Sequence, residues 1–195
     1  GLTVGHFPQS FELATVGGWV ACRGAGQYST RYGKIEDMVV GLEVALADGR
    51  HLSTGGAPRA AVGPDLNQLF VGSEGTTGIA TRICVRLTRN PQAVRTMLLD
   101  FATVREGAET VSAIIAAGVV PAAIEMMDQG MIQAAEAFTH AGMPTYAAAV
   151  VLVEVDGTAA QITHEGAVVE RVAHAHGVRT IRTAADSAER DLLWK

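Results

Sequence analysis

The chain has 195 residues, 48% of them apolar, and a formal net charge of −5. This length allows one domain or two small ones with a sizeable buried core. The acidic balance and the lack of any basic run argue against a nucleic-acid surface, and no apolar stretch is long and unbroken enough to predict a membrane span. Cys22 and Cys84 have no partner at metal-ligand spacing, so we predict no metal site and a reducing compartment.

The first half of the chain is predicted to consist of short strands joined by glycine-rich turns. It begins with Gly1 and not with Met, so a cut or processed end is expected and targeting stays open. Asp48 and Gly49 are typical of a tight hairpin turn, and Pro64 is typical of a helix start. The elements predicted are strands at residues 1–6, 38–46, 51–52 and 79–87, a loop at 53–62 and a short helix at 65–70.

A glycine-rich stretch covers residues 15–26, where four glycines make the backbone permissive. A flat cofactor edge lying along this segment would be held mainly by backbone groups, with the Thr15 hydroxyl adding a side-chain hydrogen bond. The alternative is a glycine-rich turn that holds no ligand, and the commoner role for Cys22 is that of a small buried thiol. Candidate cofactor contacts in this region are Ser10, Thr15, Gly17, Gly18, Cys22 and Gly24.

A second glycine loop lies at residues 72–78, with a glycine at every third position. It leads into an alternating stretch, Ile79 to Leu87, that is typical of a half-buried strand. Backbone amides in such a loop could hold an anionic or polar cofactor, and a tight connection without a ligand is the alternative. The loop is neither a GxGxxG fingerprint nor a Walker loop, because a strand follows it and no Gly-Lys-Ser/Thr is present. Candidate contacts here are Glu74, Gly75, Gly78 and Ile79.

Beyond Asn90 and Pro91, which mark a boundary, strands and helices alternate. Thr103 and Glu106 are typical of a capping box, and Asp128 is expected to cap the helix that follows it rather than to act in catalysis. The predicted strands lie at residues 94–101, 122–127, 146–155 and 178–182, and the predicted helices at 103–117, 129–139, 158–176 and 186–194. This order indicates a ferredoxin-like α+β sandwich.

Two stretches of the sequence resemble a known family. GPDLNQLFVGSEGTTGIAT, residues 63–81, resembles the signature of FAD-linked oxidases of the vanillyl-alcohol oxidase (PCMH-type) superfamily, with Thr77 where the family usually has Leu. FPQSFELATVGGWVACRGAG, residues 7–26, resembles the stretch under the pyrophosphate and the flavin ring, with the closest likeness to alkyl-dihydroxyacetonephosphate synthase. The resemblance implies the cofactor FAD and an α+β fold, in which the second lobe of a PCMH-type FAD-binding domain, residues 1–90, precedes a ferredoxin-like cap domain, residues 91–195.

The resemblance also implies that the chain is a fragment. The family's earlier glycine-rich pyrophosphate loop has no counterpart here, and its substrate-binding Arg/Lys pair and histidine-rich region lie after the position of Lys195. Two residues of this chain are expected on the substrate side. His6 aligns with a histidine near the active site of the synthase branch, and Glu125 lies in VVPAAIEMMD, residues 119–128, which resembles the cap of the glycolate oxidase FAD subunit.

The family implies an FAD-dependent enzyme that oxidises a small 2-hydroxy acid, glycolate or D-lactate, to the 2-oxo acid by hydride transfer to the flavin. A synthase-like flavin-dependent transferase is the alternative. The synthase has Arg where Glu125 stands, and a carboxylate there would repel a phosphate ester. A third alternative is an isolated fragment without bound flavin or activity. We expect a cytoplasmic protein and leave open peripheral membrane attachment, a homodimer, membership of an oxidase complex and the electron acceptor.

Overall fold

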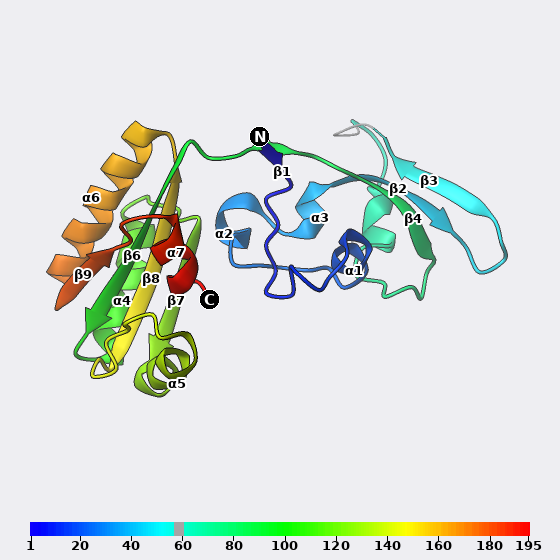
Figure 1. The fold of residues 1–195 in the computed structure, drawn as a ribbon. Helices are drawn as coiled ribbons and strands as arrows, with labels where there is room; N and C mark the ends of the chain where they lie inside the picture. The colour runs from blue at the N-terminus through cyan, green and yellow to red at the C-terminus, as the bar shows by residue number, and fades with distance from the viewer. Residues whose placement is uncertain (57–60) are drawn as a thin grey trace. The chain divides into compact units, whose positions relative to one another are not determined.

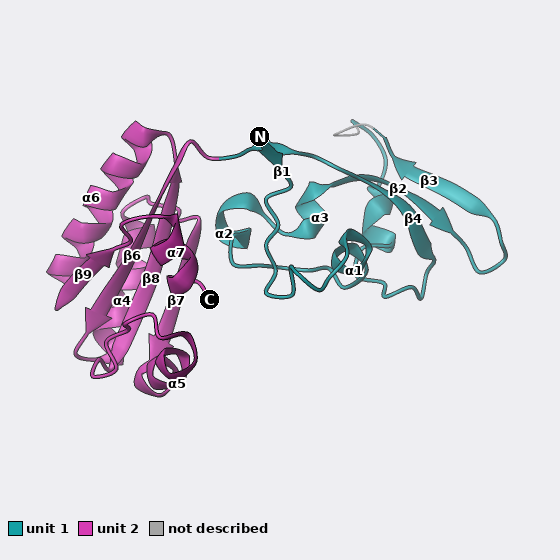
Figure 2. Cartoon of the chain, viewed as in Figure 1, with its two compact units in different colours: residues 1–90 teal, residues 91–195 magenta. Residues whose placement is uncertain are grey.

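The computed structural model describes residues 1–56 and 61–195 (Figure 1). The chain divides into two compact units, Gly1–Asn90 and Pro91–Lys195, called unit 1 and unit 2 below (Figure 2). Each unit has its own sheet and its own hydrophobic core. No helix among the described residues is long and apolar enough to cross a membrane.

Unit 1 is built on a small antiparallel sheet with short helices packed against it. Its elements are β1 (Leu2–Thr3), α1 (Val16–Ala21), α2 (Ser29–Tyr32), α3 (Ile35–Met38), β2 (Val39–Ala45), β3 (His51–Gly55), the 3-10 helix η1 (Leu66–Leu69), β4 (Ile79–Val85) and β5 (Thr88–Arg89). The strand order is β3-β2-β4, and β1 pairs separately with β5. One cluster of buried side chains forms the core, namely Val20, Ile35, Met38, Leu42, Val44, Phe70 and Val71.

The β2–β3 hairpin forms at the predicted turn. The Gly49 amide donates to the Leu46 carbonyl oxygen at 2.9 Å, and Gly49 has a φ of 83°, which glycine adopts without steric cost. The strand β3 continues to Gly55, so the loop predicted at residues 53–62 begins later than expected. Residues 57–60 of that predicted loop lie outside the described residues.

Two further predictions for unit 1 hold in a shorter form. The strand expected at residues 1–6 is limited to β1, and the helix expected at residues 65–70 is the single turn η1. The side chain of Asp65 caps η1 by accepting a hydrogen bond from the Asn67 amide at 3.0 Å.

The alternation predicted for β4 is interrupted by a β-bulge. The register with β2 shifts between Glu43 and Val44, so that Thr81 has no partner position of its own. The expectation that Ile79 and Ile83 share one face is therefore wrong, because one inserted residue reverses the side to which side chains point. Ile83 packs on the core, whereas Ile79 is 59% exposed.

Three short helices of unit 1 have no counterpart in the sequence prediction. The helix α1 begins inside the glycine-rich stretch 15–26, where Thr15 caps it by accepting a hydrogen bond from the Gly18 amide at 3.1 Å. Because glycine disfavours a helix by about 1 kcal/mol per residue, α1 depends on tertiary contacts such as those of the buried Val20. The helices α2 and α3 have four residues each, too few to show a 3.6-residue period.

Unit 2 has a ferredoxin-like α+β fold. Its elements are β6 (Ala93–Phe101), α4 (Val104–Ala116), β7 (Ala123–Asp128), α5 (Gln129–Thr139), β8 (Ala149–Gly157), α6 (Ala159–Ala175), β9 (Thr180–Thr183) and α7 (Ser187–Leu193). The sheet is antiparallel, with the order β7-β8-β6-β9. The helices α4 and α6 pack on one face, and α5 and α7 pack on the other (Figure 1), which buries β6 and β8 on both sides.

The caps predicted for unit 2 are confirmed. The Thr103 hydroxyl accepts from the Glu106 amide at 3.2 Å, and the Glu106 carboxylate accepts from the Thr103 amide at 2.9 Å. Asp128 caps α5 by accepting from a first-turn amide at 2.9 Å. The strand expected from Tyr146 begins only at Ala149, and Tyr146 is exposed.

A buried carboxylate fastens the C-terminal helix of unit 2 to the sheet. Glu154 on β8 accepts hydrogen bonds from the Thr96 hydroxyl at 2.6 Å, the Arg190 Nε at 2.9 Å and the Trp194 Nε1 at 2.8 Å. A buried carboxylate without partners is costly, so the position of Glu154 depends on the docking of α7.

Candidate functional site

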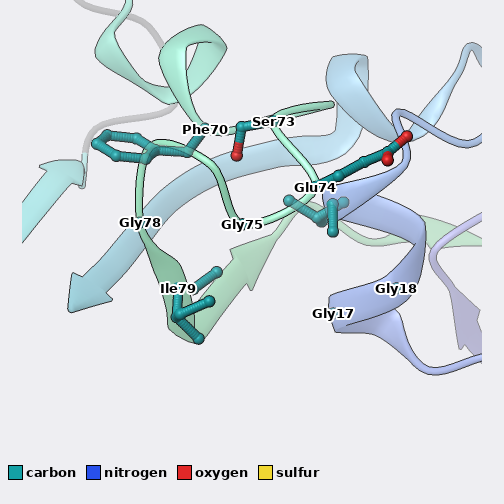
Figure 3. Close-up of a pocket in the computed structure, with 11 residues that line it drawn as sticks. Gly17, Gly18, Phe70, Ser73, Glu74, Gly75, Gly78 and Ile79 are labelled. Carbon is teal, nitrogen blue, oxygen red and sulfur yellow. The ribbon is translucent and has the colours of Figure 1, made fainter. Parts of the chain in front are cut away.

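A cavity of about 290 Å³ in unit 1 lies between α1, the glycine loop at residues 72–78 and the start of β4 (Figure 3). Figure 3 shows Gly17 and Gly18 of α1 on one side and the loop with Gly75 and Gly78 on the other. Six of the residues expected to contact a cofactor line this cavity, namely Gly17, Gly18, Glu74, Gly75, Gly78 and Ile79. The remaining lining residues are Val20, Ala21, Phe70, Ser73 and Ala80. The cavity thus joins the two glycine-rich stretches of the sequence.

Two backbone hydrogen bonds hold the walls of the cavity together. The Gly72 amide donates to the Val20 carbonyl oxygen at 2.9 Å, and the Glu74 amide donates to the Ala21 carbonyl oxygen at 3.0 Å. The β4 bulge places Ile79 at the cavity instead of in the core. These contacts join segments far apart in the sequence, so no short stretch of sequence predicts them.

Gly17 and Gly18 are glycines that the chain's own packing does not explain. Neither has a left-handed φ. Among the residues that the structure describes, a Cβ at either position would meet only the Thr15 hydroxyl oxygen within 4 Å, at 3.7 Å and 3.5 Å respectively. Gly78 differs, because a Cβ there would lie 2.5 Å from Val44 Cγ1. The space beside Gly17 and Gly18 therefore suits a bound group that approaches the helix backbone closely.

Four other expected contacts do not line the cavity. Thr15 caps α1, while Ser10 is exposed and accepts backbone hydrogen bonds through its carbonyl oxygen. Gly24 is explained by packing, since a Cβ would lie 3.1 Å from His6 Nε2. Cys22 is exposed, so the expectation of a small buried thiol is wrong, because the residue ends α1 at the surface.

His6 is buried against Trp19, with the two rings edge to face and their centroids 5.0 Å apart. Neither ring nitrogen of His6 has a hydrogen-bond partner among the described residues, and the Trp19 Nε1 has none either. Burial lowers the pKa of His6 below its ordinary value, because desolvation disfavours the charged ring. His6 is therefore a neutral imidazole at neutral pH.

Glu125 lies on β7 of unit 2, opposite Leu152 of β8, and its side chain is exposed. Glu125 belongs to unit 2, and His6 belongs to unit 1. Within the described ranges, 1–56 and 61–195, no three His, Cys, Asp or Glu side chains form a group that could hold a metal ion.

The chain matches two known protein families. The family described as FAD linked oxidases, C-terminal domain, matches residues 90–195, and the FAD binding domain family matches residues 1–55. The chain belongs to the FAD-linked oxidase family. The expected fold class, the second lobe of a PCMH-type FAD-binding domain followed by a ferredoxin-like cap, is confirmed, and so is the cofactor FAD.

Individual relatives point the same way. The chain is 37% identical to glycolate oxidase subunit GlcD of Bacillus subtilis over 93% of its length, which is 39% of that protein. It is 34% identical to the probable mitochondrial D-lactate dehydrogenase of Danio rerio over 93% of its length, which is 37% of that protein. A solved structure of alkyldihydroxyacetonephosphate synthase superposes with a TM-score of 0.82 at 25% identity, covering 98% of this chain and 38% of the synthase. The chain thus spans under two fifths of these relatives.

The residues around the cavity fit a part of FAD. Ligand pockets for whole small molecules hold roughly 300–1,000 Å³, so a cavity of about 290 Å³ accommodates a portion of the dinucleotide. The bare backbone at Gly17 and Gly18 suits a flat or phosphorylated group, and Ile79 and Phe70 add apolar surface. Phe70 and Ser73 are not among the candidate cofactor contacts predicted from the sequence, although both lie within the signature at residues 63–81.

Proposed function

We propose that this chain is part of an FAD-dependent oxidoreductase that oxidises a small 2-hydroxy acid, glycolate or D-lactate, to the 2-oxo acid. Residues 1–90 supply the second lobe of the FAD-binding domain, and residues 91–195 supply a substrate cap. The observation that carries the proposal is the cavity beside Gly17 and Gly18, two glycines that no contact among the described residues explains, in a member of the FAD-linked oxidase family.

The chain's own part in the reaction is binding and positioning. Bound FAD would supply the acceptor for the hydride from the α-carbon of the hydroxy acid. Gly17 and Gly18 allow the helix backbone to approach the cofactor, and the loop with Gly75 and Gly78 forms the opposite wall. Ile79 contributes apolar surface to one side of the cavity.

His6 and Glu125 are the residues proposed for the substrate side. Neither nitrogen of the neutral His6 ring has a hydrogen-bond partner among the described residues, so one of them is available as a proton acceptor. The exposed Glu125 carboxylate disfavours a phosphate ester and leaves an uncharged or singly charged substrate as the better match. This carboxylate is the reason for placing a hydroxy acid ahead of a phosphorylated substrate.

Anaerobic reduction of the bound flavin tests the proposal. The purified protein with FAD is mixed with glycolate, D-lactate or L-lactate without oxygen, and the visible flavin absorbance is followed. Bleaching by glycolate or D-lactate, and slower or no bleaching by L-lactate, is expected. Unchanged absorbance with all three acids, in a preparation shown to hold bound FAD, would refute a 2-hydroxy-acid oxidoreductase.

A flavin-dependent transferase of the synthase type is the second candidate. The similarity to the solved alkyldihydroxyacetonephosphate synthase structure favours it, as does the likeness of residues 7–26. Glu125 opposes it, for the electrostatic reason above. Bleaching by D-lactate with no acyl phosphate substrate present separates the two candidates, because the transferase would need that substrate.

The third candidate is a chain that holds no flavin by itself. FAD titration of the 195-residue chain tests it, with quenching of flavin fluorescence as the signal. Saturable quenching would refute this candidate, and a lack of quenching at millimolar FAD would support it.

A further inference from the structure

Arg23 combines a strained backbone with a side chain that reaches two other segments of unit 1. Among the described residues, the non-glycine residues with a left-handed φ are Arg23 at 52°, Glu74 at 50° and His140 at 52°. Arg23 follows the end of α1, where the Gly24 amide donates to the Trp19 carbonyl oxygen at 2.8 Å. Glycine is the usual residue at this helix-ending position, so retention of a long side chain there needs a reason.

The hydrogen bonds of the Arg23 guanidinium explain why a long side chain stands at this helix-ending position. Its Nη2 donates to the Val71 carbonyl oxygen at 3.0 Å, and its Nη1 donates to the Glu36 carboxylate at 2.6 Å. Val71 precedes the glycine loop and Glu36 lies on α3, so one side chain ties α1 to both. A planar guanidinium can make both bonds at once, which a lysine ammonium on a flexible stem does less well.

The glycine loop at residues 72–78 packs closely against the Arg23 side chain. A Cβ at Gly72 would lie 2.9 Å from Arg23 Nε and 3.0 Å from Arg23 Cβ, so only glycine lets the loop approach so closely. The same approach allows the amides of Gly72 and Glu74 to bond the carbonyl oxygens of Val20 and Ala21. The loop and α1 are the two walls of the cavity.

We propose that Arg23 is a positioning residue for the flavin cavity, holding the wall with Glu74 at a fixed distance from the wall with Gly17 and Gly18. The inference rests on the proposed placement of FAD in this cavity. Arg23 acts through the loop and lies outside the set of residues that line the cavity.

The test compares Arg23→Lys and Arg23→Gly with the wild-type chain. Arg23→Gly removes the side chain and relieves the strained φ, so a loss of binding in that variant cannot be attributed to backbone strain. Arg50→Lys is the matched control, because Arg50 forms an exposed ion pair with Asp48 at 2.7 Å in the β2–β3 turn. Amide hydrogen exchange at Gly72 and Glu74 and the Kd for FAD are both measured, with thermal unfolding as a check on folding.

We expect faster exchange at Gly72 and Glu74 in both Arg23 variants and an FAD Kd raised about tenfold or more, with Arg50→Lys unchanged in both. Unchanged exchange at the two amides would overturn the clamp itself. Faster exchange with an unchanged Kd would overturn its positioning role. If the wild-type chain takes up no FAD, the proposed cofactor site fails, and the positioning role fails with it, whatever the exchange rates are.

Discussion

Gly18→Ala should stabilise the protein without FAD and weaken FAD binding at the same time. Gly18 lies in α1, and a Cβ there meets only the Thr15 hydroxyl oxygen, at an ordinary contact distance of 3.5 Å. Alanine is favoured over glycine in a helix by about 1 kcal/mol. For a unit of about 90 residues this gain raises the Tm by roughly 4 °C or more.

The same methyl group stands in the cavity that Gly18 lines. Overpacking a filled site costs about 1–3 kcal/mol, which corresponds to a Kd raised roughly five- to 150-fold. Stability and affinity are therefore expected to change in opposite directions. A residue kept for folding alone would show a stability change and no effect on the cofactor.

Thermal unfolding of the chain without FAD and fluorescence titration with FAD measure the two effects. Gly130→Ala is the control, since Gly130 lies in α5 and a Cβ there would meet only Asp128 Oδ1, at 3.6 Å. This control should stabilise unit 2 and leave the Kd as it is. If Gly18→Ala binds FAD as the wild-type chain does, the cavity is not the cofactor site.

Three further outcomes follow from buried or capping groups. Burial lowers the pKa of His6 below its ordinary value of 6.5, so the unfolded chain binds more protons and unit 1 should lose stability as the pH falls from about 7 to 5. His6→Phe should flatten that loss in a thermal unfolding series, and an equally steep loss would exclude His6 as its cause. Glu154→Ala should lower the free energy of unfolding, measured with denaturant, by about 3 kcal/mol, because the variant removes the carboxylate that accepts from Arg190 and Trp194. Glu43→Ala, which breaks an exposed ion pair with Arg82, should lower it by less than about 1 kcal/mol. Equal losses in the two variants would contradict the role of burial. Asp128→Ala should cost about 1 kcal/mol and Asp128→Asn much less, and a similar loss in both variants would argue against capping.

The elements of unit 2 follow from signals that lie close together in the chain. Thr103 and Glu106 bond each other's backbone amides across three residues, and Asp128 bonds an amide three residues ahead. The strand β8 begins with an unbroken apolar run, residues 149–153, and α6 spans 17 residues, long enough for the helical period to show. Local chemistry alone therefore predicts these elements to within a few residues.

The elements of unit 1 that shape the cavity have no such signal. The helix α1 contains two glycines in six residues and is held by a buried Val20 and by bonds from the loop at residues 72–78. The bulge at Thr81 depends on the partner strand β2, and it alone decides that Ile79 faces the cavity. A periodic pattern cannot show an insertion whose cause lies on another strand.

The sequence by itself determined the family, the cofactor and the order of elements in the cap, because long motifs and nearby capping residues carry that information within short segments. Tertiary structure alone decided which glycines are open to a ligand. All three of Gly17, Gly18 and Gly78 are glycines in the sequence. The side chain of Val44 occupies the space that a Cβ at Gly78 would take, whereas the space beside Gly17 and Gly18 is open. That difference arises from packing between segments distant in the chain, and no local pattern records it.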